Sequence, residues 1–127
     1  MLTKSHRFHG YGSLRSVYRQ GRTVRSPMLA LRFSKNENRA TWRCAVVVAK
    51  KVSRSAVTRN RIRRRLYEAV RTESANLNGS YDLVLTVFSE QLATSPADEL
   101  QQAVTKLLDQ AGLITKTTHA IIEPKER

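Results

Sequence analysis

The chain has 127 residues, which suits one domain and leaves little room for a second independent core. Lys and Arg number 23 against 10 Asp and Glu, so the formal net charge is +13, and the hydrophobic fraction of 40% argues against wholesale disorder. No apolar run approaches the roughly 20 residues of a membrane-spanning helix, and the N-terminus lacks the apolar segment of a secretory signal. The single cysteine, Cys44, excludes an internal disulfide framework, and we expect a cytoplasmic protein.

The N-terminal half predicts one short helix and two strands. Apolar residues at helical spacing predict a helix over residues 12–20, and Gly21 fits the position just past its end. Residues 22–27 form a turn-rich stretch with room for one short strand near 22–24. Residues 28–34 alternate apolar and polar side chains, which predicts a half-buried strand. After a polar turn, a strand over 41–49 is expected to return as its hairpin partner, and its β-branched run predicts burial on both faces.

The C-terminal half predicts a long basic helix, a strand and a last helix. Residues 50–58 form a basic crossover into a helix over 56–75, whose predicted buried face consists of Ile62, Leu66, Ala69 and Val70. A turn over 76–80 and a strand over 81–88 follow. Ser95 is the predicted N-cap and Pro96 the first position of the last helix, which Gly112 ends. We expect one α+β domain over residues 1–114, a two-layer sandwich of sheet and helices, and a flexible tail over 115–127.

The positive charge is concentrated in the first part of the chain. Residues 1–49 carry a net charge of +9 and residues 50–71 of +8, whereas residues 72–127 carry −4. This distribution predicts a surface that binds a polyanion. Nucleic acid is favoured over a membrane surface, because no strongly apolar face accompanies the arginines on a lone amphipathic helix.

The arginines of the long helix divide by their angle around its axis at 100° per residue. Opposite the buried face lie Arg61, Arg64 and Arg71. On a flank or near the apolar boundary lie Arg63, Arg59 and Arg65, the last two able to extend outward along the surface. Contacts between arginine side chains and phosphates neutralise charge but carry little information about base sequence. The predicted partner is therefore a structured RNA or a duplex that is recognised by its backbone.

Asn60 interrupts this arginine row, and two interpretations stay open: a specific hydrogen-bonding role, or a capping role early in the helix. The residues around it form a longer motif. Lys50-Lys51-Val52 ends a β-branched strand, and Arg59-Asn60-Arg61 opens the basic helix after a short crossover. In this context the motif resembles the signature of the protein subunit of bacterial ribonuclease P. Supporting similarity extends over residues 7–113.

The resemblance implies a small basic protein that binds a catalytic RNA, in a ribonucleoprotein that removes the 5′ leader of precursor tRNA with Mg²⁺ acting with the RNA. It implies the order α-β-β-β-α-β-α with a left-handed crossover, and no obligate protein partner or membrane. Charge and resemblance assign RNA binding to Lys50, Lys51, Arg54, Arg59, Asn60, Arg61, Arg63, Arg64 and Arg65. The resemblance assigns a leader cleft between the first helix and the sheet to Leu14, Tyr18 and Arg32.

Three further alternatives bear on function. Tyr18 is either a base-stacking platform or part of the apolar stripe of the first helix. Arg32 lies where many relatives carry an aromatic residue, and it would hold a phosphate or stack through its guanidinium plane. The alternative function is a ribosomal or other structured-RNA-binding protein without a role in tRNA cleavage. Nothing places His6, His9 and His119 together for acid–base catalysis, so we do not expect the protein alone to be catalytic.

Overall fold

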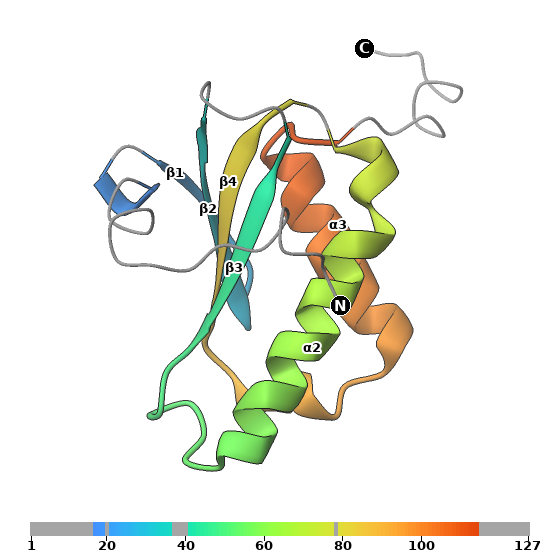
Figure 1. Cartoon of the computed structure of the whole chain (residues 1–127). Helices are drawn as coiled ribbons and strands as arrows, with labels where there is room; N and C mark the ends of the chain where they lie inside the picture. The colour runs from blue at the N-terminus through green and yellow to red at the C-terminus, as the bar shows by residue number, and fades with distance from the viewer. Residues whose placement is uncertain (1–16, 20, 37–40, 78, 115–127) are drawn as a thin grey trace.

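The computed structural model describes residues 17–19, 21–36, 41–77 and 79–114. Its strands are β1 (Arg22–Arg25), β2 (Leu29–Lys35), β3 (Arg43–Val48) and β4 (Tyr81–Val87). Its helices are α2 (Ala56–Thr72), α3 (Ala97–Gln110) and the short 3₁₀ helices η1 (Ser74–Asn76) and η2 (Glu90–Ala93). The helices α2 and α3 cover one face of a single sheet, and the helical residues 17–19 lie on the other side (Figure 1). The predicted α+β class is confirmed.

The order of the strands in the sheet is β1-β2-β4-β3, with β3 parallel to β4 and the other neighbours antiparallel. The predicted hairpin between the strands over 28–34 and 41–49 is wrong, because β4 lies between them. Leu83 pairs with Phe33 on one side and with Cys44 on the other. The hairpin partner of β2 is instead β1, so the short strand near residues 22–24 exists. The helix α2 connects the parallel strands β3 and β4, and the left-handed course of this crossover stays a prediction.

The main core lies between the sheet and the helices α2 and α3. The buried residues of α2 are Ile62, Leu66, Ala69 and Val70, as the helical spacing predicts. They pack with the residues of β2, β3 and β4 that face the helices, and with buried residues of α3. On the opposite face, Val17 packs on Ala45 and Val84, with Val47 beside them. Both faces of β3 are therefore covered, which explains its continuous apolar run.

Gly21 brings the end of the first helix close to β2. Its backbone N–H donates to the carbonyl of Val17 at 2.7 Å. A Cβ atom at this position would lie 2.4 Å from that carbonyl oxygen and 2.9 Å from the carbonyl oxygen of Phe33. Both neighbours are backbone atoms that cannot rotate away, so only glycine permits this approach.

The ends of the last helix differ in part from the prediction. The N-cap of α3 is Pro96, no side chain caps it, and the Oγ of Ser95 has no hydrogen-bond partner in the described part of the chain. The predicted serine cap is thus wrong. Gly112, with φ of +75°, ends α3 as predicted. Leu113 and Ile114, the last residues of the expected domain, are buried, and Ile114 bridges to Leu77. The expected tail over 115–127 lies outside the described residues.

Candidate nucleic-acid interface

The basic stretch begins in the loop that precedes α2. Lys50, Lys51 and Arg54 are all exposed, and within the described residues none of them has a partner. The helix then begins at Ala56, where the hydroxyl of Ser55 accepts a hydrogen bond from the N–H of Thr58 at 3.2 Å. The first turn of α2 contains no acidic residue. This loop and the positive end of the helix dipole therefore form a continuous surface that favours an anion.

Asn60 has a hydrogen bond to the arginine one turn further along α2. Its Oδ1 accepts from Nη1 of Arg63 at 2.8 Å, and the Asn60 side chain is exposed. The capping interpretation is wrong, since Ser55 occupies the N-cap five residues earlier. The contact orients the guanidinium group of Arg63 along the helix surface. Any hydrogen bond from Asn60 to RNA stays a prediction.

Three of the predicted RNA-binding arginines of α2 donate to backbone carbonyls of the protein itself. Nη1 of Arg59 donates to Ser53 at 2.9 Å. Nε of Arg61 donates to Ala93 at 2.8 Å, although helical angle alone directs Arg61 away from the core. Nη1 of Arg65 donates to Leu92 at 2.7 Å, and Nη2 donates to Ser95. We call the bonds of Arg61 and Arg65 the arginine–η2 contacts. They fix α2 to the segment that leads into α3.

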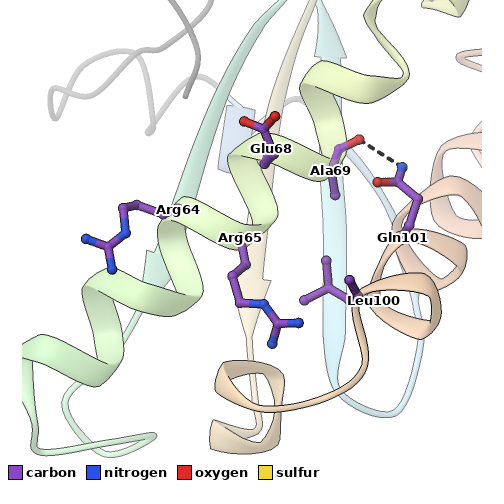
Figure 2. Close-up of a pocket in the computed structure, with 7 residues that line it drawn as sticks. Arg64, Arg65, Glu68, Ala69, Leu100 and Gln101 are labelled. Carbon is purple, nitrogen blue, oxygen red and sulfur yellow. Dashed lines mark hydrogen bonds between the residues drawn. The ribbon is translucent and has the colours of Figure 1, made fainter.

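Arg64 differs from its neighbour Arg65. Its side chain is exposed and has no partner among the described residues, and it extends away from the protein (Figure 2). Its planar group of five N–H donors suits the paired oxygens of a phosphate. With Lys50, Lys51 and Arg54, it forms the part of the predicted basic surface that is free to bind a polyanion.

A groove of about 430 Å³ separates α2 from α3 (Figure 2). Its lining combines charged, polar and apolar residues: Arg64, Arg65, Glu68, Ala69, Ala97, Leu100 and Gln101. Nε2 of Gln101 donates to the carbonyl of Ala69 at 3.0 Å, across the two helices. Glu68 forms an ion pair with Arg71, whose guanidinium group holds the pKa of that carboxyl below its usual range. The groove depends on the packing of two helices, so no pattern in the sequence predicts it.

Two residues that the sequence assigned to the leader cleft, Tyr18 and Arg32, lie close together in the structure. Tyr18 is 44% exposed, so its side chain is not part of the core. Arg32 donates to the carbonyls of Val17, at 3.1 Å, and Tyr18, and to Oγ1 of Thr23 at 2.7 Å. Its guanidinium carbon lies 6.0 Å from the centre of the Tyr18 ring. Arg32 thus anchors the end of the first helix, and its expected phosphate contact stays a prediction. Leu14 lies outside the described residues.

Phe88 is a second exposed aromatic residue, which was not among the candidate residues predicted from the sequence. Phe88 follows β4, is 46% exposed, and has the guanidinium carbon of Arg25 5.9 Å from its ring centre. Its N–H donates to the carbonyl of Met28 at 2.8 Å, which continues the β2–β4 pairing. By strand alternation Phe88 falls on the same face as Val84, the face against which Val17 packs. Residues 81–88 are mostly apolar, so their sequence does not show which side chains face the helices and which face the opposite side.

A buried ion pair lies within the sheet. Nε and Nη2 of Arg43 donate to the two carboxylate oxygens of Asp82 at 2.9 and 2.8 Å, and Nδ2 of Asn36 donates to the same carboxylate at 3.0 Å. Asp82 pairs with Arg43 in the β3–β4 register. The structure therefore gives Asp82 a structural role within a strand pair.

No group of three or more His, Cys, Asp or Glu residues that could hold a metal ion lies in the described part of the chain. No described helix is long and apolar enough to cross a membrane. His6, His9 and His119 lie outside the described residues.

Comparison with known proteins gives consistent matches in sequence and fold. The Ribonuclease P family model matches residues 2–112. The ribonuclease P protein component of Chloroflexus aurantiacus is 37% identical over 123 residues, or 97% of this chain and 90% of that protein. The Roseiflexus castenholzii component is 36% identical over 113 residues, or 89% and 91%.

Two solved structures share the fold at low sequence identity. The Staphylococcus aureus RNase P protein matches with a TM-score of 0.77, over 88% of this chain and 100% of that chain, at 19% identity. The Thermotoga maritima RNase P protein matches with a TM-score of 0.69, over 76% and 89%, at 20% identity.

Proposed function

The chain belongs to the ribonuclease P protein family, and on that premise we propose that it is a non-catalytic subunit that binds both the catalytic RNA and the 5′ leader of precursor tRNA. As a protein component of ribonuclease P, it has the RNA of that enzyme as its partner. The proposal concerns how the chain contacts this RNA and the substrate. The reaction is hydrolysis of the tRNA precursor at the 5′ end of the mature tRNA, with Mg²⁺ acting with the RNA subunit.

The proposal rests on the unpartnered basic surface formed by the loop before α2 and by Arg64 on the helix itself. Lys50, Lys51, Arg54 and Arg64 are exposed and paired with no carboxylate in the described chain. A surface of this kind binds phosphates and releases counterions, so binding must weaken as salt rises. The arginine–η2 contacts fix the position of this surface, because they hold α2 against the rest of the protein while Arg64 points outward.

The salt dependence of RNA binding tests this surface. We expect Arg54→Ala and Arg64→Ala each to weaken binding to the cognate ribonuclease P RNA and to lower the slope of log K against log salt by about 1. Lys106→Ala removes the same charge from an exposed position on α3 and is the matched control. Equal slopes for all three variants and the wild type would contradict the assignment of the basic surface.

Leader binding is proposed for the face that carries Tyr18 and Phe88. Two exposed aromatic rings, each with a guanidinium group nearby, are suited to stacking with the bases of a single strand. We expect Tyr18→Ala and Phe88→Ala each to weaken affinity for precursor tRNA about tenfold and to leave mature tRNA affinity unchanged. Val57, 76% exposed on α2, offers Val57→Ala as the control. Equal losses for precursor and mature tRNA would show that these rings do not contact the leader.

A further inference from the structure

We propose that the groove between α2 and α3 binds a single unpaired nucleotide of the ribonuclease P RNA, with its base in the groove and its phosphate on Arg64. This inference rests on the proposed function and extends it to α3, an element outside the predicted basic motif. It also gives a role to groove residues, among them Ala97 and Gln101, that neither charge nor motif singled out.

The dimensions and the walls of the groove suit a flat aromatic base. Its volume of about 430 Å³ lies within the roughly 300–1,000 Å³ that is usual for small-ligand sites. The buried side chains of Ala69 and Leu100 form its apolar floor (Figure 2), and the exposed Ala97 adds an apolar side chain from α3. A base gains from leaving water in such a site, because both of its faces are apolar while its edge carries the polar atoms.

The charge at the rim favours a nucleotide over an apolar peptide. Arg64 contributes to the groove and to the basic surface, so the groove is continuous with the surface that binds RNA. Arg65 lines the same side, but its Nη1 and Nη2 atoms donate to Leu92 and Ser95. Arg64 is therefore the group available to a phosphate. The carboxylate of Glu68, one turn further along α2, is paired with Arg71 and does not compete for Arg64.

Gln101 supplies a polar contact for the edge of the base. Its Nε2 donates to the carbonyl of Ala69 at 3.0 Å and to Oγ1 of Thr105 at 3.4 Å, which orients the amide. Its Oε1 has no partner within the described residues and lies on the α2 side of the amide (Figure 2). An amide oxygen in this position accepts a hydrogen bond from an amino or ring N–H group, so the groove favours bases that present such a donor.

Filling the groove tests the proposal in the full-length protein. Ala97→Trp places a large ring at the start of α3 against the groove, whereas Gln102→Trp places the same ring on an exposed site of α3 that does not line it. We expect Ala97→Trp to weaken binding to the cognate RNA about tenfold, as for the loss of one stacked base, and Gln102→Trp to change it less than twofold. Urea unfolding of both variants checks that the fold is retained.

A crosslink identifies the nucleotide even if Ala97→Trp disturbs the fold. Cys44 is fully buried and does not compete for thiol reagents, so an Ala97→Cys variant can carry a single photoreactive label. We expect its crosslinks to map to one unpaired nucleotide, and labelled Gln102→Cys to miss it. An RNA with an abasic site there should bind about tenfold more weakly to the wild type and show no further loss with Ala97→Trp.

Two results would overturn the proposal. If Ala97→Trp binds RNA as the wild type does while Arg54→Ala binds more weakly, the groove is not an RNA site and the proposed function stands. If the crosslinks from residue 97 fall only within base-paired helices, the groove does not hold a single unpaired nucleotide. Failure of the wild type to bind the cognate RNA at all would instead contradict the proposed function.

Discussion

Replacing Arg65 with alanine should destabilise the protein, whereas replacing its neighbour Arg64 should not. Arg65 donates to two backbone carbonyls, those of Leu92 and Ser95, and its side chain is half-buried. A hydrogen bond from a charged donor contributes about 1.5–3 kcal/mol, and partial exposure places each of these near the lower limit. We therefore expect Arg65→Ala to lower the free energy of unfolding by about 3 kcal/mol.

Urea unfolding measures this difference directly. With a slope of about 1–3 kcal/mol per molar urea, the midpoint for Arg65→Ala should fall by about 1–3 M. Arg64→Ala removes the same charge from an exposed side chain, so its free energy of unfolding should change by less than about 0.5 kcal/mol. For RNA binding we expect the opposite ranking: Arg64→Ala should reduce the salt dependence of binding more than Arg65→Ala does.

A third variant separates charge from geometry. Arg65→Lys keeps the positive charge, but a single ammonium group lacks the planar pair of donors that reaches two carbonyls. We expect it to recover only part of the lost stability. Equal midpoints for the wild type and Arg65→Ala would refute the structural role that we assign to Arg65.

Other variants test the remaining structural assignments. Asp82→Ala leaves the Arg43 side chain, only 16% exposed, without its carboxylate and should destabilise the protein by about 3 kcal/mol, whereas an unchanged melting temperature would contradict the ion pair. Ser55→Ala should cost about 1 kcal/mol because it removes the cap of α2. Ser95→Ala should cost less than about 0.5 kcal/mol, and a loss equal to that of Ser55→Ala would show that Ser95 is a cap after all. Burial raises the pKa of the Cys44 thiol from its ordinary value to about 12. As pH rises, the thiol therefore ionises in the unfolded chain before it does in the folded protein. The free energy of unfolding should fall above about pH 9 by about 1.4 kcal/mol per pH unit. Unfolding measured against pH should show this fall in the wild type and not in Cys44→Ala.

Features that depend on local spacing could be predicted from the sequence. The four buried residues of α2 recur at helical intervals, so their common face follows from the geometry of one helix. Gly112 ends α3 for an equally local reason. Strand order is different, because it depends on pairing between distant segments. The insertion of β4 between β2 and β3 has no local signal, and the usual preference for pairing of consecutive strands led to the wrong hairpin.

The candidate site shows the same limit. The sequence identified the basic stretch, because charge density and the Arg59-Asn60-Arg61 motif are properties of the chain itself. Helical angle places Arg64 opposite the buried face and Arg65 near its boundary, but it could not show that Arg65 is bound by the protein itself, since the carbonyls that accept from Arg65 belong to residues 92 and 95. It also could not locate the groove, because its two walls come from residues 64–69 and 97–101, at least 28 positions apart in the chain.

Cleavage of precursor tRNA at low magnesium concentration tests the central claim most directly. Three reactions are compared: the protein alone, the cognate ribonuclease P RNA alone, and the two together. We predict cleavage at the mature 5′ end only in the mixture, with Arg64→Ala protein giving less cleavage than the Lys106→Ala control. Cleavage by the protein alone, or equal cleavage with and without the protein, would contradict the claim that this chain is an RNA-binding, non-catalytic subunit.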